Sequence, residues 1–240
     1  MKLFTVVYND ARLLPPFLRH YGNAGIKEFY LATAPEYSST AREYAEHYEI
    51  FVIEGLDVTE SMSAGSAAVG EMRRLHQQDA EWVVIVDLDE FIEFDETITQ
   101  VVSAAEDEGA NVVRGIMYDR FTRNGRLSDF EPNADLSKIY PVKSRFVRDV
   151  MGGCDHKGVL VKGKIMGAPR GGHHWFAGER VFSRTLEISH YKWNSTSIMR
   201  VKRAHEALVA MGIPWAIEYK RVIDHYEQHG RFAWEEFGGE

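Results

Sequence analysis

The sequence predicts an α/β fold in which a mostly parallel sheet is flanked by helices. In the first 118 residues, short runs of β-branched and aromatic residues alternate with segments whose apolar residues recur every three or four positions. The composition, 45% hydrophobic and 27% charged over 240 residues, is typical of a globular chain with a substantial core. Strands that alternate with helices usually pair in parallel, because each connecting helix returns the chain to the same end of the sheet.

The first strand and helix are predicted from the N-terminal residues. Residues 3–8 form a β-rich run that ends at the turn-forming pair Asn9-Asp10. The apolar residues that follow share one helix face: Leu13, Leu14, Phe17, Leu18 and Tyr21. Pro15-Pro16 fits only the first turn of this helix, where a missing N–H has little effect on stability.

The remaining elements follow from the same patterns. We expect strands at residues 29–32, 50–53, 82–86 and 111–117, and helices near 41–48, 64–78 and 98–105. Residues 140–191 are β-rich with glycine-dense turns, and two helices follow at about 196–211 and 215–228. We therefore expect one domain, 1–240, with an α/β half at 1–118, a β-rich half at 119–195 and C-terminal helices at 196–240.

Charge and cysteine content exclude several classes of protein. The chain has 28 Lys and Arg against 36 Asp and Glu, and a net charge of -8 disfavours bulk nucleic acid binding. Cys154 is the only cysteine, so an intrachain disulfide cannot form and a reducing compartment is the simplest location. The apolar runs at 3–8 and 82–86 are too short for a signal peptide or a membrane span. We expect a cytoplasmic protein, with peripheral association at the inner membrane face left open.

The charges are also unevenly distributed along the chain. All charged residues between Arg74 and Arg114 are acidic, whereas residues 143–170 are mostly basic. An acidic segment and a basic segment in one chain suit a site that holds a metal cation together with an anionic ligand.

Asp87 and Asp89 are the strongest candidates for metal ligands. They follow the apolar run at 82–86, and ligands bind at the carboxyl ends of strands in open α/β sheets. Two carboxylates spaced two residues apart suit Mg²⁺ or Mn²⁺ that bridges a diphosphate. The alternative is a solvated acidic turn after a buried strand, since a D-x-D triplet alone is a weak motif.

Three parts of the chain resemble glycosyltransferase family 2, a family of nucleotide-sugar enzymes with the GT-A fold, and in particular its small bacterial members. These parts are residues 9–18 with His20-Tyr21 and residues 25–30; residues 81–91; and Gly172-His173-His174 with residues 190–193. The similarity extends over most of residues 3–205. It implies a GT-A-type Rossmann-like sheet. Residues 1–118 would bind the donor, and residues 119–195 would bind the acceptor and complete the metal site.

The resemblance also implies roles for individual residues. Asp87 and Asp89 would hold Mn²⁺ or Mg²⁺ on the donor diphosphate, and His190, at the end of a predicted strand, would complete the metal shell. The residues implied to contact the nucleotide sugar are Tyr8, Asn9, Asp10, Asp87, Lys157, His174 and Lys192. Lys162 and Lys164, in contrast, fit ordinary solvated surface lysines.

A general base must take the proton from the acceptor hydroxyl in an inverting transfer. The sequence offers Asp155, on a glycine-rich turn before a strand, and Asp119, just past the strand at 111–117, and we rank Asp155 first. Each could instead be a turn residue or the ion-pair partner of Arg120 or Lys157. Many relatives carry an Asn-x-Ser-x-Asp run after the second strand, and residues 32–39 depart from it, which leaves the nucleotide base undetermined.

We therefore expect a metal-dependent glycosyltransferase that moves a sugar from a UDP- or GDP-sugar to a hydroxyl on a glycan or lipid-linked acceptor, with inversion at the anomeric carbon. One alternative is a catalytically silent sugar-nucleotide-binding module. Another is a nucleotidyltransferase, although the loop at residues 9–12 lacks the glycines that such enzymes usually have there.

Overall fold

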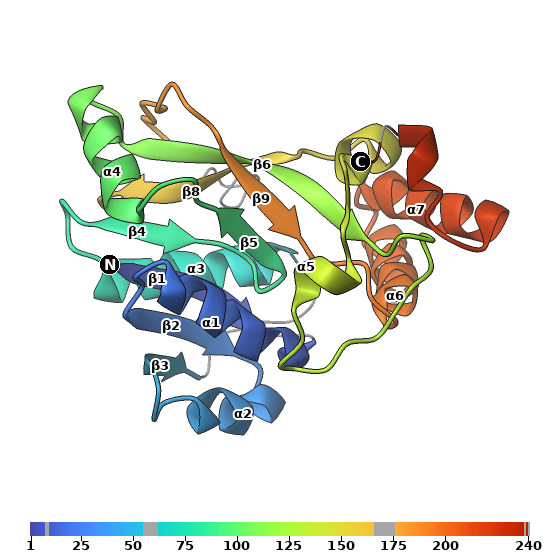
Figure 1. Cartoon of the computed structure of the whole chain (residues 1–240), viewed down its shortest axis with the longest axis horizontal. Coiled ribbons are helices and arrows are strands. Elements are labelled where there is room, and N and C mark those ends of the chain that lie inside the picture. The colour runs from blue at the N-terminus through green and yellow to red at the C-terminus, as the bar shows by residue number, and fades with distance from the viewer. Residues whose placement is uncertain (8–9, 55–61, 166–175, 238, 240) are drawn as a thin grey trace. The chain divides into compact units, whose positions relative to one another are not determined.

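A computed structural model describes residues 1–7, 10–54, 62–165, 176–237 and 239 of the chain (Figure 1). The chain forms two compact units. Unit 1 comprises Met1–Ile116 and His156–Glu187, and unit 2 comprises Met117–Asp155 and Ile188–Glu240. Two strands, β6 (Val112–Phe121) and β9 (Leu186–His190), contribute residues to both units.

The sheet of unit 1 confirms the predicted α/β fold. Four parallel strands stand in the order β3 (Glu49–Ile53), β2 (Glu28–Thr33), β1 (Lys2–Val7) and β4 (Trp82–Ile85). β8 (His156–Lys162) pairs antiparallel with β4, and the first half of β6 pairs antiparallel with β8. All four parallel strands match predicted ones within about two residues, a usual uncertainty for element ends.

Both faces of β1, β2 and β4 are buried, which explains why their sequences are nearly continuous apolar runs. Phe4, Tyr30 and Ile85 belong to one buried cluster, to which helix α3 (Met62–His76) contributes Met72. Leu3, Leu31 and Val84 alternate with that set, point to the other face and are also fully buried.

The other helices of unit 1 follow the predicted spacing. α1 (Leu14–Asn23) carries its two prolines in the first turn, as predicted. α2 (Ser38–Glu43) is shorter than the predicted helix, because the chain turns from Tyr44 onward. α4 (Ile98–Asp107) begins at a capping box made by Thr97 and Gln100. Two short 3-10 helices, η1 (Ala11–Leu13) and η2 (Pro35–Tyr37), follow β1 and β2.

A short strand that the sequence patterns did not predict, β5 (Glu90–Glu93), follows the D-x-D turn. Four residues are too few to show the alternation that would identify a strand in the sequence. Tyr21 of α1 fixes this strand: its hydroxyl donates to Glu90 O at 2.9 Å and accepts from Ile92 N at 3.0 Å. Burial raises the pKa of Tyr21 well above its usual value, so the hydroxyl stays protonated.

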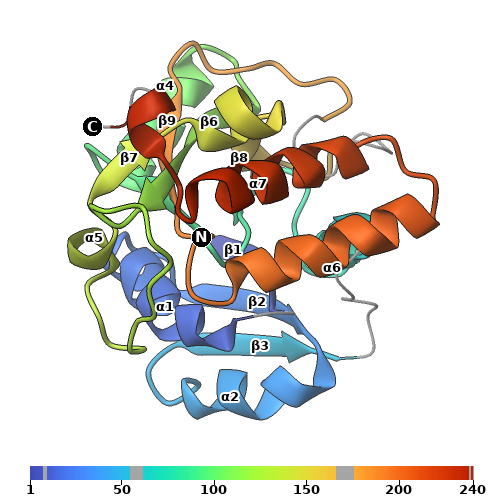
Figure 2. The ribbon, with the colours of Figure 1, turned by 90° about the vertical axis from the view of Figure 1, so that its right-hand side faces the viewer.

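Unit 2 combines short β elements with helices (Figure 2). The second half of β6 pairs antiparallel with β7 (Val142–Ser144). The helical elements are α5 (Leu136–Ile139), the π-helical turn η3 (Val147–Met151), α6 (Ser197–Ala210), α7 (Ala216–His229) and the 3-10 helix η4 (Trp234–Phe237). α6 and α7 confirm the two predicted C-terminal helices.

The core of unit 2 is aromatic. Phe121, Phe146, Trp193 and Phe232 are buried, and their ring centroids lie between 4.8 and 6.2 Å apart. Edge-to-face and offset contacts of this kind suit the quadrupoles of aromatic rings. In the part of the chain that the structure describes, no helix is long and apolar enough to span a membrane.

Candidate functional site

The candidate site lies in unit 1, at the carboxyl ends of the parallel strands. β1 and β2 end together, since Val7 pairs with Thr33, and Ala34 N donates to Val7 O at 3.0 Å. β4 runs parallel to β1, and Val86 N donates to Phe4 O at 3.4 Å before the chain turns. The segments after these strands therefore leave the sheet at one edge, where α/β sheets bind ligands.

Residues 87–90 form a tight turn between β4 and β5. Glu90 N donates to Asp87 O at 3.0 Å, and the Glu90 side chain returns to accept from Asp87 N at 2.9 Å. The side chain of Asp87 is 47% exposed and Asp89 is partly exposed, whereas Leu88 and Glu90 are buried. The turn thus presents both carboxylates of the D-x-D motif at the surface and directs Glu90 inward.

Lys157 on β8 bridges the surface carboxylate of Asp87 and the buried carboxylate of Glu90. Its side chain is 1% exposed, and the ammonium Nζ donates to Glu90 Oε1 at 2.6 Å, to Glu90 Oε2 at 2.8 Å and to Asp87 Oδ2 at 2.9 Å. Burial lowers the pKa of Lys157, but the charges of Asp87 and Glu90 and their hydrogen bonds outweigh it, so the pKa is raised. The ammonium is therefore charged at neutral pH and holds the Asp87 carboxylate in place.

The donor set of Asp87 and Asp89 fits a divalent cation. A carboxylate has about four lone-pair positions, and the Lys157 contact uses one of those on Asp87. Hard carboxylate oxygens are the ligands that Mg²⁺ and Mn²⁺ prefer. Within the described residues of unit 1, no third His, Cys, Asp or Glu completes a ligand group with them. In unit 1 the described chain would thus supply two ligands, a number that suits a cation also bound by phosphate oxygens and water.

Asp10, predicted to meet the nucleotide, lies after β1 with a backbone φ of 26°. It is the one described non-glycine residue with positive φ, a conformation that Asp tolerates better than most residues. Its buried carboxylate accepts from Arg12 Nε at 2.6 Å and from Arg12 Nη2 at 3.0 Å. Three other predicted positions, Tyr8, Asn9 and His174, lie outside the described residues.

In unit 2, Asp119 is fully buried and accepts three hydrogen bonds. Oδ1 accepts from Trp193 Nε1 at 2.6 Å and bonds to His190 Nδ1 at 3.0 Å, while Oδ2 accepts from Val147 N at 2.8 Å. A carboxylate on Nδ1 fixes the orientation of an imidazole and its tautomer. Asp119 therefore positions His190, which is the last residue of β9 as predicted.

Asp155 and Lys192, the other predicted residues of unit 2, also have partners. Asp155 is 4% exposed and forms an ion pair with Nε, at 2.8 Å, and Nη2 of Arg145, a partner that the sequence did not suggest. Lys192 Nζ lies 5.5 Å from the ring centroid of Trp193 and 5.8 Å from that of Tyr219. These cation–π contacts place the ammonium over two aromatic faces.

Several roles stay predictions. Asp87, Asp89 and Lys157 belong to unit 1, whereas His190, Asp119, Asp155 and Lys192 belong to unit 2. His190 as a metal ligand, Asp155 or Asp119 as the general base, and Lys157 or Lys192 as phosphate contacts are therefore expectations to be tested by mutation.

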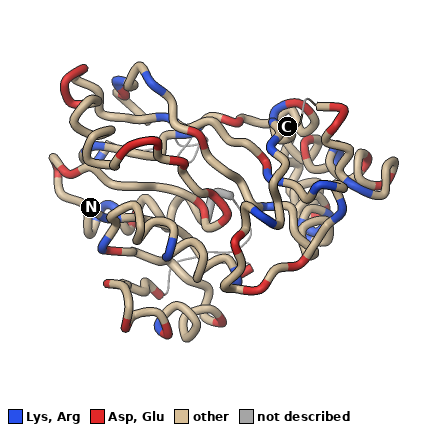
Figure 3. The backbone as a smooth tube through the Cα atoms, in the orientation of Figure 1, with Lys and Arg blue, Asp and Glu red and all other residues tan. Residues whose placement is uncertain are grey.

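The charge segregation along the sequence has a local explanation in unit 1. Basic residues of the later segments pair with acidic residues between Arg74 and Arg114: Lys162 with Glu106, Lys164 with Asp79, and Arg184 with Glu96 (Figure 3, in which basic residues are blue and acidic residues red). Lys162 and Lys164 are partly exposed, as expected for ordinary surface lysines. The pair that differs from these is Lys157 with Glu90, since both of its side chains are buried.

No protein-family model matches the sequence, and no curated protein matches it. Solved structures overlap with part of the chain. HddC from Yersinia pseudotuberculosis has a TM-score of 0.36 at 8% identity, over 54% of this chain and 63% of that one. A UDP-glucose pyrophosphorylase complexed with UDP-glucose has a TM-score of 0.35 at 8% identity, over 60% of this chain and 66% of that one.

A third overlap is with 4-diphosphocytidyl-2C-methyl-D-erythritolsynthase from Anaerococcus prevotii, with a TM-score of 0.34 at 12% identity, over 58% of this chain and 66% of that one. The chain thus spans less than two thirds of each of these three proteins. The functional proposal therefore rests on the residues of the chain itself.

Proposed function

We propose that the chain is a metal-dependent glycosyltransferase that uses a nucleotide diphosphate sugar, a UDP- or GDP-sugar, as donor and a hydroxyl of a glycan or lipid-linked molecule as acceptor. The observation that carries this proposal is the Asp87–Glu90 turn at the carboxyl end of β4. It presents two partly exposed carboxylates and holds one of them in a fixed position. The sequence resemblance to glycosyltransferase family 2 supports the choice of reaction.

The buried Lys157–Glu90 pair prepares Asp87 for this role. Lys157 binds one oxygen of Asp87, and Glu90 binds the Asp87 backbone N–H, so both ends of the residue are fixed. A carboxylate that is already ordered loses less conformational entropy when a cation binds. Asp89, which is partly exposed in the same turn, would supply the second carboxylate.

The cation would neutralise the negative charge of the leaving diphosphate. The chain's own residues bind and orient the donor through Asp87 and Asp89. Proton removal from the acceptor is assigned to Asp155 first and Asp119 second, as the sequence predicts. Inversion at the anomeric carbon belongs to the same proposal.

Nucleotide binding provides the first test. Thermal unfolding is measured with UDP, GDP, CDP, ADP and TDP at millimolar concentration, each with Mn²⁺ and with EDTA. A ligand that binds the folded state raises the Tm, so we expect one nucleotide to raise it in the presence of Mn²⁺ only. Asp89→Asn should abolish this shift, whereas Asp95→Asn, at an exposed position of the same acidic segment, should retain it. Absence of any shift with all five nucleotides would overturn the proposal.

Product analysis separates the reaction classes. Sugar transfer or donor hydrolysis releases the nucleoside diphosphate from a nucleotide sugar, whereas a nucleotidyltransferase run in reverse with pyrophosphate releases the nucleoside triphosphate. Incubation with the nucleotide sugar selected by the binding test, with and without pyrophosphate, therefore distinguishes them. Release of the diphosphate that requires Asp89 supports glycosyl transfer. Triphosphate formation contradicts it, and binding without turnover by either route identifies a silent module.

A further inference from the structure

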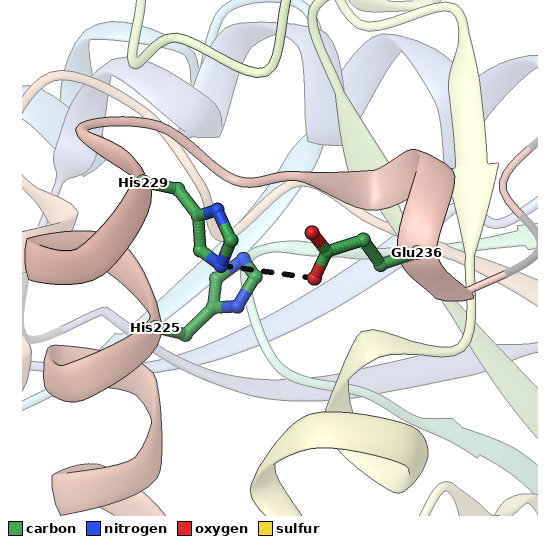
Figure 4. A group of neighbouring side chains, drawn as sticks. All are labelled: His225, His229 and Glu236. Atoms are coloured by element: carbon green, nitrogen blue, oxygen red, sulfur yellow. Dashed lines mark ion pairs between the residues drawn. The ribbon is translucent and has the colours of Figure 1, made fainter.

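We propose that His225, His229 and Glu236 form a binding site for a transition-metal ion of the Zn²⁺ class in unit 2. Two of the ligands are on α7 and the third is on η4, close to the C-terminal end of the described chain (Figure 4). The ligand atoms of the three residues lie within 4.8 Å of one another. This site is separate in sequence and in ligand chemistry from Asp87 and Asp89.

The local backbone explains how the three side chains meet. His225 and His229 are four residues apart on α7, so they project from the same helix face, and their ring centroids are 4.7 Å apart. Gly230 ends the helix in the left-handed conformation at φ 64°, and its N–H donates to Tyr226 O at 2.8 Å. The chain then reverses, and Glu236 comes to face the two imidazoles.

The distance between His229 and Glu236 suits an ion better than a direct bond. His229 Nε2 and Glu236 Oε2 are 3.7 Å apart, beyond the usual range for an N–H···O hydrogen bond. Two ligand atoms that each lie about 2.0–2.1 Å from a tetrahedral zinc are roughly 3.3 Å apart. A small movement of Glu236, whose side chain is 53% exposed, would therefore bring both atoms to bonding distance.

His225 is the inner ligand. It is 8% exposed and packs against Phe146 and Phe237 with centroid distances of 5.4 and 5.1 Å. Its Nε2 accepts a hydrogen bond from Ala233 N at 3.1 Å. Binding of an ion through Nε2 would replace this hydrogen bond, whereas binding through Nδ1 would retain it. In either case the imidazole joins the helix to the C-terminal turn.

The donor set selects the class of metal. Two imidazoles and one carboxylate are a common zinc set, and three protein ligands leave a fourth position for water. Mg²⁺ and Ca²⁺ prefer oxygen ligands, so they should bind here much more weakly. A bound ion would cross-link α7 to η4 and stabilise this end of unit 2, because the unfolded chain does not hold the three ligands together.

The test uses the full chain after chelator treatment and dialysis. Zn²⁺ binding is measured by calorimetry and by the rise in Tm, and Co²⁺ is added separately for its visible absorption spectrum. We expect one equivalent of Zn²⁺ with a Kd of about 10 µM or tighter, a raised Tm, and a Co²⁺ spectrum typical of four or five nitrogen and oxygen ligands. Mg²⁺ at the same concentration should give no effect.

Variants identify the ligands. His229→Gln and Glu236→Gln, both at partly exposed side chains, should each weaken Zn²⁺ binding at least tenfold and abolish the Co²⁺ spectrum. His205→Gln, on α6 of the same unit, should bind like the wild type. Asp89→Asn should also retain binding, which distinguishes this site from the proposed donor site. No binding at about 100 µM Zn²⁺, or equal binding by the wild type and both ligand variants, would overturn the proposal.

Discussion

At the residue scale, the contact that most defines the candidate site is the buried ammonium of Lys157. It is 1% exposed, it faces two carboxylates, and Glu90 is 2% exposed. Placing charges in a protein interior is unfavourable unless they are paired and fully hydrogen-bonded, and this pair meets both conditions through three short contacts. The stability of the D-x-D turn therefore depends on one lysine from a strand 70 residues later in the chain.

Replacing Lys157 with Met should destabilise the protein by about 3–5 kcal/mol, because it leaves Glu90 as an unpaired buried charge. The free energy of unfolding in urea measures the effect. The double variant Lys157→Met/Glu90→Gln should regain part of the loss, since it removes that charge. Lys162→Met, which breaks a partly exposed ion pair on the same strand, should remain close to the wild type. Equal stabilities of Lys157→Met and Lys162→Met would contradict the interpretation.

The sequence located Asp87 and Asp89 but not the residues that hold them. A D-x-D triplet after an apolar strand is a local motif, so a single segment of the sequence is enough to identify it. The partnership of Glu90 with Lys157, in contrast, depends on the register between β4 and β8, which only the folded sheet defines. The partners of Asp119 were likewise not predictable from the sequence. Its hydrogen bonds to His190 and Trp193 join segments more than 70 residues apart.

At the element scale, Gly125 provides a contact that no other residue could make. Its φ is +68°, and a Cβ atom built there would lie 2.0 Å from the carbonyl oxygen of Phe232. The close approach allows Phe232 N to donate to Gly125 O at 2.8 Å. Phe232 is part of the aromatic core of unit 2, so this turn and that core are linked directly.

Gly125→Ala should therefore destabilise the protein by about 3 kcal/mol or more, through backbone strain together with displacement of Phe232. Gly212→Ala is the matched control, because its φ is +66° and nothing lies within 4 Å of an added Cβ. The control should lose only about 1 kcal/mol of unfolding free energy, because only the backbone strain at positive φ remains. Urea unfolding of both variants gives the comparison, and equal losses would show that the contact with Phe232 O contributes nothing.

The start of α4 gives a second test at this scale. Thr97 accepts from Gln100 N at 3.3 Å, and Gln100 returns a side-chain contact to Thr97 N at 3.0 Å. Thr97→Ala should destabilise the protein by about 1 kcal/mol, because it leaves a helical N–H without its cap. Thr99→Ala, at an exposed position in the same turn, should change stability by less than about 0.5 kcal/mol. Thermal or urea unfolding can measure both, and similar losses would argue against the cap.

The elements themselves were largely predictable, for a physical reason. Apolar periodicity over ten or more residues located α1, α3, α6 and α7, because burial of one face is encoded within a single segment. Segments of three to five residues, such as β5, α5 and η3, were missed. They are too short for a period and form only because distant residues pack on them, as Tyr21 does on β5.

At the scale of the whole molecule, the chain builds two cores of different chemistry. Unit 1 has an aliphatic cluster with Tyr30 and Phe4 between its sheet and α3, whereas unit 2 has a cluster of aromatic rings. The apolar runs of the parallel strands indicate the first, since each run lies within a single segment of the sequence. The second collects rings from β6, the segment before η3, the residue after Lys192 and the loop after α7, and no local pattern joins these.

Burial of His20 contributes to the response of global stability to pH. Burial lowers the pKa of His20 below 6.5, although the hydrogen bond to Ile92 O at 2.9 Å and the charge of Glu93 oppose this shift. On acidification the unfolded chain therefore takes up a proton at this position before the folded protein does. The contribution of neutral His20 to the free energy of unfolding is fully present above about pH 6.5, and it is lost as the pH falls toward the lowered pKa.

We expect the free energy of unfolding to fall between pH 7.5 and pH 5.5, and to fall less in His20→Gln, whose amide can still donate to Ile92 O. All other titratable groups are the same in both proteins, so the difference between the two slopes isolates His20. Lys157 and Tyr21, whose pKa values are raised, contribute only in alkaline solution, because a raised pKa leaves each group protonated throughout this range. Urea titrations at three pH values measure the slopes, and parallel slopes for the wild type and His20→Gln would show that burial of this imidazole does not govern the acid response.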